Sequence, residues 1–256
     1  MPGLSANLGF LWTELSLLEA VRRAHAAGFD AVECHWPYDV PPAELRAALE
    51  ETGLPLLGLN TRKGAREGDF GLAAVSGREV EARAGIDEAV AYAAAVGARA
   101  VHVMAGRAVE DDTARAFFDA NLAYACKVAA PHGLTILIEP INHRDVAGYF
   151  LSRVEQAAAV IERVGADNLK IMFDCYHTQI MQGDLLRRFE AHRQVIGHVQ
   201  IAAVPSRAEP DEGEICYERL IADMRKCGYD GYVGAEYRPR AGTDAGLGWR
   251  AVCQAG

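Results

Sequence analysis

The sequence lacks the features that would place it in a membrane, on nucleic acid or in a disulfide framework. No apolar run approaches the roughly 18 residues that a membrane-spanning helix needs. Basic residues number 26 against 35 acidic ones, and the formal net charge of -9 argues against binding a nucleic-acid backbone. The cysteines include no C-x-x-C pair, so we expect small, buried, reduced side chains at Cys34, Cys126, Cys175, Cys216, Cys227 and Cys253.

Other absences narrow the location and the fold. The N-terminus has no basic region leading into a long apolar stretch, so we expect no signal peptide and a cytoplasmic protein. No G-x-G-x-x-G follows the first expected strand, which disfavours the dinucleotide-binding form of an open sheet. No linker, low-complexity stretch or charge run divides the chain, and 50% of its residues are hydrophobic. We therefore predict one domain over residues 1–256.

Short β-rich segments alternate with helical segments along the whole chain. The segments that have the composition of buried strands are 5–8, 31–35, 54–60, 99–104, 135–139, 169–174, 196–201 and 232–236. The helical patterns between them are 16–27, 42–51, 80–96, 113–130, 152–164 and 217–226. This alternation leaves two α/β architectures, a closed (β/α)8 barrel of the TIM type or an open doubly wound sheet.

Local signals mark the helix ends and one unusual loop. Ser152-Arg-Val-Glu155 has the form of a capping box. Glycines suited to the left-handed turn that stops a helix precede four of the expected strands, at Gly28, Gly53, Gly97 and Gly228. The glycine-rich, charged segment 61–78 is too long for a simple connection. It is either a lid over a site or an ordinary surface loop.

Four apolar runs in the second half of the chain each end on a carboxylate or a carboxamide, at Glu139, Asp174, Gln200 and Glu236. All strand C-termini of a closed parallel barrel open on one face, so we expect these side chains to converge there, which favours the barrel. Three carboxylates and one amide oxygen form a hard-oxygen site suited to Mg²⁺ or Mn²⁺. For any single one of these residues, the alternative to metal binding is an ion pair with a neighbouring arginine or lysine. Such a partner is needed because burying an unpaired carboxylate is costly.

Further polar residues follow the same strand ends. His177 comes close after Asp174, and four roles stay open for it. It binds the metal, orients the carboxylates, contacts the substrate or is a plain loop histidine. Just past the fifth expected strand, either Asn142 or His143 is placed to reach the same pocket.

Another group of candidates lies on other strands and loops. Arg207, in the loop after the seventh expected strand, offers a fork for a substrate carboxylate, and a solvated surface arginine is the alternative. Glu33 and His102, near the ends of two earlier strands, are placed to line the mouth of the barrel. His198 faces the same side as Gln200, one layer deeper, either supporting the site or simply filling the core.

Several characteristic stretches follow one another along nearly the whole chain. They include Gly28-Phe-Asp-Ala-Val-Glu33, Ile138-Glu-Pro-Ile-Asn-His143, Asp174-Cys-Tyr-His-Thr-Gln179, Gly197-His-Val-Gln-Ile-Ala202 and Gly234-Ala-Glu-Tyr237. Together and in this order, they resemble the hydroxypyruvate isomerase family of xylose-isomerase-like barrels. Ketose 3-epimerases of the same superfamily usually offer a histidine on the seventh strand. The residue there, Gln200, is similar to the hydroxypyruvate isomerase pattern instead.

The resemblance implies that Glu139, Asp174, Gln200 and Glu236 bind a divalent metal and that the two glutamates are the acid–base pair. It implies a small hydroxy-oxo acid as substrate, hydroxypyruvate giving tartronate semialdehyde, or a 2-oxo-tetronate, by enediolate proton transfer. The sequence departs from the family pattern in Lys63-Gly-Ala-Arg-Glu-Gly-Asp-Phe-Gly71 and in Val204-Pro-Ser-Arg-Ala208, where substrate choice is made.

Three other functions stay open. They are a 3-epimerase of free ketoses, an endonuclease at abasic DNA sites, which the negative charge disfavours, and a barrel that binds a sugar acid without catalysis. Barrels of this group often associate, but no exposed stripe identifies an interface, so the sequence leaves a homo-oligomer open.

Overall fold

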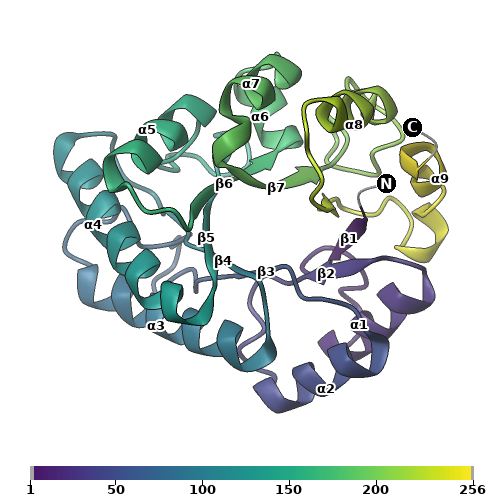
Figure 1. The fold of residues 1–256 in the computed structure, drawn as a ribbon, viewed down its shortest axis with the longest axis horizontal. Helices are drawn as coiled ribbons and strands as arrows, with labels where there is room; N and C mark the ends of the chain where they lie inside the picture. The colour runs from purple at the N-terminus through teal and green to yellow at the C-terminus, as the bar shows by residue number, and fades with distance from the viewer. Residues whose placement is uncertain (1–2, 255–256) are drawn as a thin grey trace.

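Eight parallel strands form a nearly closed barrel in the computed structural model, which describes residues 3–254 (Figure 1). Residues 1–2 and 255–256 of the predicted domain lie outside the described residues. The strands follow the order β2-β1-β8-β7-β6-β5-β4-β3. At the seam between β2 and β3, Val32 pairs with Leu56, and the backbone N–H of Cys34 donates to the carbonyl of Gly58 at 3.1 Å. The prediction of a barrel rather than an open sheet is confirmed.

The strands are short and mostly buried, and each predicted strand overlaps an observed one. They are β1 (Leu4–Asn7), β2 (Ala31–Glu33), β3 (Gly58–Asn60), β4 (Ala100–His102), β5 (Thr135–Ile138), β6 (Leu169–Asp174), β7 (Ile196–Ile201) and β8 (Val233–Ala235). β6 and β7 have the predicted bounds, whereas β3 begins four residues later than predicted, at Gly58. Because all pairs are parallel, the carboxyl ends of the strands lie at one end of the barrel.

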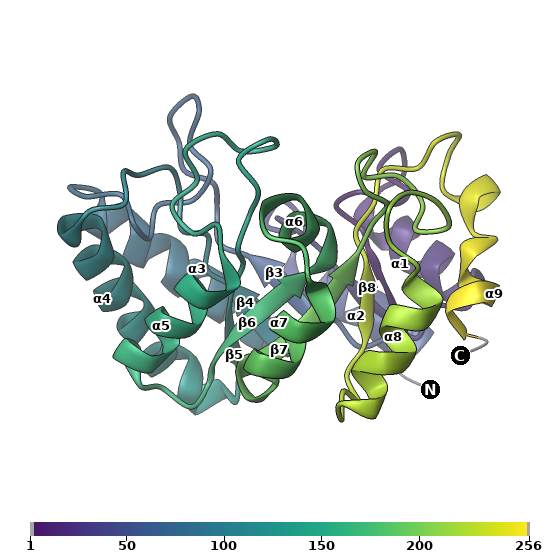
Figure 2. The same ribbon diagram turned by 90° about the horizontal axis from the view of Figure 1, so that it is seen from above.

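Helices surround the barrel (Figures 1 and 2). They are α1 (Leu17–Ala26), α2 (Pro42–Thr52), α3 (Glu79–Val96), α4 (Asp112–Ala129), α5 (Val154–Val164), α6 (Cys175–Met181), α7 (Leu185–His192), α8 (Tyr217–Lys226) and α9 (Trp249–Gln254). Short 3-10 turns are η1 (Ala130–His132), η2 (Arg193–Val195) and η3 (Asp244–Gly246). The sequence analysis did not predict α6, α7 and α9, because segments of six to eight residues are too short to show a helical period.

The glycines expected at helix ends have the predicted conformation. Gly53 and Gly97 are the C-caps of α2 and α3, with φ of 69° and 75°. Gly28 and Gly228 come one residue after the C-caps of α1 and α8, with φ of 78° and 84°. Each turns the chain back toward the next strand.

The capping box predicted at Ser152 is wrong. The N-cap of α5 is Arg153, without a side-chain cap, and the backbone N–H of Ser152 donates to Oε1 of Gln156 at 2.9 Å. Glu155 is drawn away from the helix start by Gln182, whose Nε2 donates to Oε2 of Glu155 at 2.5 Å. The capping box that does form joins Ser16 and Glu19 at the start of α1.

The main core lies between the barrel wall and the helices. Ile136 on β5 and Phe118 on α4 are 0% exposed, and Phe118 meets Phe150 edge to face at 5.4 Å between ring centroids. A second, smaller apolar cluster inside the barrel joins Ala100 and Met172 through Leu137. No helix within residues 3–254 combines the length and apolarity that crossing a bilayer would need.

The cysteines are unpaired, as predicted, where their side chains are described. Cys34, Cys126 and Cys175 are buried, Cys227 is half-buried, and none of these forms a disulfide within the described residues. Cys216 is exposed, so the expectation of burial is wrong there, because it caps the exposed start of α8. The side chain of Cys253 lies outside the described residues.

Candidate active site

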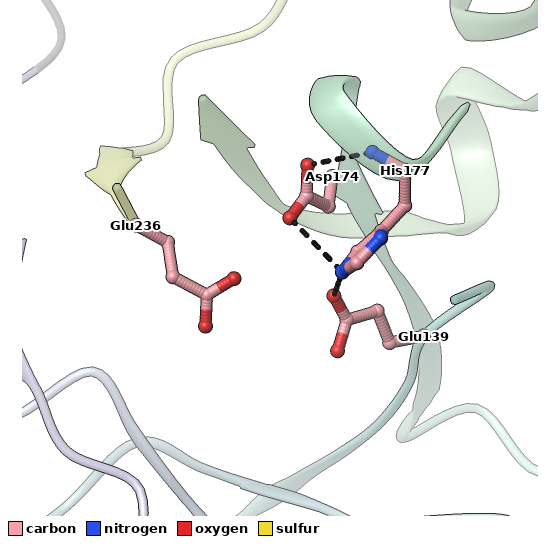
Figure 3. A group of neighbouring side chains, drawn as sticks. All are labelled: Glu139, Asp174, His177 and Glu236. Atoms are coloured by element: carbon pink, nitrogen blue, oxygen red, sulfur yellow. Dashed lines mark hydrogen bonds and ion pairs between the residues drawn. The ribbon is translucent and has the colours of Figure 1, made fainter. Parts of the chain in front are cut away.

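Three strand-end carboxylates and one histidine converge at the carboxyl end of the barrel (Figure 3). Glu139 follows β5, Asp174 ends β6, Glu236 follows β8 and His177 lies in the first turn of α6. Each offers one ligand atom, and these atoms all lie within 4.8 Å of one another. The carboxylate of Glu236 extends toward the other three residues from across the barrel. This buried group could hold a metal ion.

Burial and mutual repulsion set the charge state of the three carboxylates. Burial, and next the charge of Glu236, raises the pKa of Asp174 to about 7. Burial, Glu236 and Asp174 together raise the pKa of Glu139 well above its ordinary value. Burial also opposes ionisation of Glu236, but the hydrogen bond from His35 and the charge of Arg207 outweigh it and lower the pKa of Glu236. A bound cation would relieve this repulsion, so the donor set fits a divalent ion.

Two buried oxygens at the site have no hydrogen-bond partner within the described residues, Oε1 of Glu139 and Oε1 of Gln200. The amide nitrogen of Gln200 donates to Oε2 of Glu33 at 2.8 Å, so the oxygen is the free end of the amide. A buried oxygen without a donor is costly unless something else binds it. Both oxygens are of the kind that Mg²⁺ and Mn²⁺ prefer, which supports the predicted ligand set.

His177 lies on a helix, not on the loop that the sequence suggested. Oδ1 of Asp174 accepts the backbone N–H of His177 at 3.2 Å and so caps α6. Nδ1 of His177 lies 2.6 Å from Nδ2 of Asn142, and its Nε2 lies 3.6 Å from Oε1 of Glu139. Burial, and then Arg207, lowers the pKa of His177 well below its ordinary value, so the ring is neutral. Asn142 therefore fixes the orientation of a neutral imidazole beside the carboxylates.

Arg207 is buried, and a protein carboxylate already binds each of its two terminal nitrogens. Its Nη1 lies 2.9 Å from Oδ2 of Asp145, and its Nη2 lies 2.9 Å from Oε2 of Glu236. The guanidinium carbon lies 4.8 Å from the ring centroid of Phe10 and 5.0 Å from that of Tyr176. Only Nε lacks a hydrogen-bond partner within residues 3–254. The predicted fork for a substrate carboxylate is thus already engaged, and its role as a substrate contact stays a prediction.

Glu33 lies one layer below the carboxylates, inside the barrel. Its Oε1 accepts a hydrogen bond from Oγ of Ser5 at 2.5 Å and lies 3.0 Å from Nε2 of His198. Burial opposes the charge of both members of the pair, but the carboxylate raises the pKa of His198 and the imidazole lowers that of Glu33. A Cβ on Gly234 would lie 2.3 Å from Oε1 of Glu33, so this close approach requires glycine. These contacts make Glu33 a support for Gln200.

Two cavities meet at the site. The upper cavity, of about 320 Å³, opens at the carboxyl end and includes residues from five loops: Phe10, Lys63, Phe70, Asp145, Arg207 and Arg238. The lower cavity, of about 370 Å³, lies inside the barrel and is lined by Glu33, His198 and Gln200. Asn60, His102 and Glu236 line both.

His102 stands where the two cavities join. Its Nδ1 lies 3.7 Å from Oε2 of Glu139, and within the described residues neither ring nitrogen has a hydrogen-bond partner. Burial lowers the pKa of His102 to about 3, so this ring is also neutral. The prediction that His102 lines the mouth agrees with its place, whereas its contact with substrate stays a prediction.

The sequence analysis missed residues that bind Glu236 directly. Nδ2 of Asn7 donates to Oε1 of Glu236 at 3.1 Å, and Nε2 of His35 lies 3.0 Å from the same oxygen. Asn7 ends β1 and His35 follows β2, so the strand-end pattern that identified Glu139 would have found both. Of the two candidates after β5, Asn142 contacts His177 at the site. His143 does not reach it, because this side chain is exposed and its Nε2 lies 3.0 Å from the carbonyl oxygen of Tyr149.

Comparison with known proteins agrees with this geometry. A family model described as xylose isomerase-like TIM barrel matches residues 21–253. The chain belongs to this family. A 2-oxo-tetronate isomerase of Cupriavidus necator is 48% identical over 253 residues, which cover 97% of each chain. The hydroxypyruvate isomerase of Escherichia coli is 38% identical over 253 residues, 97% of this chain and 98% of that protein. These full-length relatives make the protein an isomerase.

Solved structures share the barrel. A crystal structure titled AP endonuclease, family 2, from Brucella melitensis superposes with a TM-score of 0.95 at 41% identity and covers 98% of each chain. An L-ribulose 3-epimerase superposes with a TM-score of 0.78 at 20% identity, over 98% of this chain and 86% of that one. At that identity the epimerase shows the shared fold alone.

Proposed function

We propose that this protein is a metal-dependent isomerase of small hydroxy-oxo acids, acting on hydroxypyruvate to give tartronate semialdehyde, or on a 2-oxo-tetronate. The observation that carries the proposal is the buried group of Glu139, Asp174 and Glu236 at a cavity of about 320 Å³. The relatives named hydroxypyruvate isomerase and 2-oxo-tetronate isomerase support the substrate class. The net charge of -9 argues against a DNA substrate.

The three carboxylates and Gln200 would hold Mg²⁺ or Mn²⁺. Bound there, such an ion supplies Lewis-acid polarisation of the substrate's carbonyl and hydroxyl oxygens, which acidifies the carbon-bound proton. The free Oε1 atoms of Gln200 and Glu139 are the support for this ligand set. Asp174, whose other oxygen caps α6, would hold its place through the helix.

Two glutamates would move the proton. Glu236 has a lowered pKa and three hydrogen-bond partners, so it is ionised and able to accept a proton from carbon. Glu139, the other glutamate of the cluster, would return a proton to the neighbouring carbon. The net change transfers one hydrogen between adjacent carbons while the hydroxyl proton passes to the former carbonyl oxygen. The neutral ring of His177 beside Glu139 would hold a substrate oxygen.

Proton NMR in D₂O tests this function. Hydroxypyruvate and a 2-oxo-tetronate would be incubated with chelator-treated protein, then with added Mg²⁺ or Mn²⁺, beside fructose and tagatose. We expect metal-dependent deuterium uptake and product formation from the acids, lost in Glu139→Gln and Glu236→Gln and retained in Glu218→Gln on exposed α8. Exchange at carbon 3 of the ketoses alone would make the protein an epimerase. No exchange from any acid would end the proposal.

A further inference from the structure

One lysine at the upper cavity has no carboxylate partner. Nζ of Lys63 lies 4.0 Å from the ring centroid of Trp36 and 5.4 Å from that of Phe70, and within the described residues it forms no ion pair. Arg238, on the chain after β8, also lines this cavity, lies over Phe10 at 5.8 Å and has no ion pair in residues 3–254. The cavity therefore contains two positive charges that the protein leaves without a carboxylate.

Lys63 is the exception among the cations of its own loop, the segment 61–78. Arg62 binds Glu88 at 2.7 Å. Arg66 lies 3.7 Å from Glu81, and Arg78 binds the same glutamate at 2.6 Å. These arginines are satisfied within the protein, and none of them lines the upper cavity. Among the described cations of this loop, only Lys63, which lines the cavity, has no ion pair.

The position of Lys63 is fixed by its backbone and by the rings below it. Its carbonyl accepts the N–H of Gly71 at 2.7 Å, which closes the base of the loop. Gly71 has φ of 102°, and a Cβ there would lie 2.5 Å from the carbonyl oxygen of Met104, so the loop is held tightly against the chain after β4. Nε1 of Trp36 donates to the carbonyl of Thr61 at 3.0 Å and fixes the ring. The ammonium is thus placed at the cavity before any ligand binds.

An acid substrate needs such a group. When its carbonyl and hydroxyl oxygens face the carboxylate cluster, its own carboxylate must lie elsewhere in the cavity. Arg207 is less available for this role, since Asp145 and Glu236 each already bind one of its two terminal nitrogens. The ammonium of Lys63 has aromatic rings and no carboxylate as its neighbours, so it can bind a substrate carboxylate without losing an ion pair within the protein.

We propose that Lys63, assisted by Arg238, binds the carboxylate of the substrate and so selects hydroxy-oxo acids over uncharged ketoses. This inference rests on the proposed function, because it names the group that recognises the acid. It also assigns a role to the segment 61–78 as a fixed wall of the cavity that carries the specificity residue.

The first test is kinetic and uses Lys63→Met, Lys63→Arg and the control Arg66→Met. Arg66 lies on the same loop, so its variant makes the same change of charge away from the cavity. For isomerisation of hydroxypyruvate with Mn²⁺, we expect Lys63→Met to raise KM roughly tenfold to a hundredfold, the range for one charge-assisted hydrogen bond, with kcat nearly unchanged. Lys63→Arg should restore most of the affinity, and Arg66→Met should match the wild type.

The second test measures binding and is independent of turnover. Isothermal titration of glycerate, an inert anion, and of dihydroxyacetone, an uncharged molecule of similar size, would be made on the Mn²⁺-loaded protein and each variant. We expect Lys63→Met to weaken glycerate roughly tenfold or more and to leave dihydroxyacetone unchanged.

Each outcome of these tests decides one of the two proposals. Equal glycerate affinity in wild type and Lys63→Met, an equal loss in Arg66→Met, or no binding to the wild type overturns the inference on Lys63. If the wild type isomerises the acid despite such a result, the proposed function stands without this residue. If the wild type turns over no acid, the proposed function fails, and the glycerate titration still decides whether Lys63 binds a carboxylate.

Discussion

The substitution Asp174→Asn removes one charge from the carboxylate cluster while keeping the local structure. Oδ1 of Asp174 accepts the N–H groups of Tyr176 at 2.6 Å and of His177 at 3.2 Å, and an asparagine oxygen can accept both. Asparagine is as good an N-cap as aspartate, so α6 should remain capped. The variant therefore isolates the electrostatic contribution of the charge.

The size of that contribution follows from the pKa of Asp174, which burial and Glu236 raise from 3.8 to about 7. At about 1.4 kcal/mol per pKa unit, keeping this group ionised costs the folded protein about 4 kcal/mol. Because the pKa of Asp174 is higher in the folded than in the unfolded protein, the folded protein loses about 4 kcal/mol of stability as pH rises from about 4 to about 7. At pH 8 without divalent cations, we expect Asp174→Asn to unfold at a temperature higher by up to roughly 8–16 °C, at about 2–4 °C per kcal/mol.

A bound metal ion should bring the stabilities of the two proteins closer together. At a hundred times its dissociation constant, Mn²⁺ would stabilise the wild type by about 2.7 kcal/mol, and the variant, lacking one ligand charge, should gain much less. Differential scanning calorimetry in EDTA and in Mn²⁺, at pH 5 and pH 8, measures both effects. The control is Asp111→Asn, at the N-cap of α4, where the side chain of Asp111 accepts the N–H of Ala114. This change lies away from the carboxylate cluster, so it should alter neither the stability in EDTA nor the gain from Mn²⁺. A variant that is less stable than wild type in EDTA at pH 8, or that gains as much from Mn²⁺, would refute this reasoning.

Three further predictions concern helix capping, thiol chemistry and packing. Ser16→Ala should destabilise the protein by about 1 kcal/mol in urea unfolding, because it removes a capping box, whereas Ser152→Ala should cost much less. Iodoacetamide at pH 8 should label exposed Cys216 and spare Cys34 in a peptide map, because burial raises the pKa of Cys34 to about 12 and leaves about one thiolate in ten thousand. Phe118→Ala should cost about 3–5 kcal/mol in the same urea assay, because the fully buried ring leaves a cavity; a loss below 1 kcal/mol would contradict the packing described.

The sequence predicted which strand-end carboxylates converge, because barrel topology alone decides that. Glu139, Asp174 and Glu236 are far apart in the chain, and they meet because parallel strands all end at one rim. What the sequence could not predict is which charged side chains from different loops form ion pairs with one another. Arg207 looked free for a substrate because its partner Asp145 comes from a different loop, and no local pattern links the two.

The interior pair of Glu33 and His198 shows most clearly why part of the site lies beyond sequence reasoning. Gln200 near the end of β7 was expected to offer an oxygen ligand, but its amide has two ends, and the sequence does not say which one is free. Oε2 of Glu33 can only accept, so it takes the amide nitrogen of Gln200 and leaves the oxygen without a hydrogen-bond partner among the described residues. This arrangement needs Gly234 on the neighbouring strand, because any side chain there would displace the carboxylate. The free end of the Gln200 amide is thus fixed one layer deeper, by Glu33, which the sequence analysis placed at the mouth of the barrel.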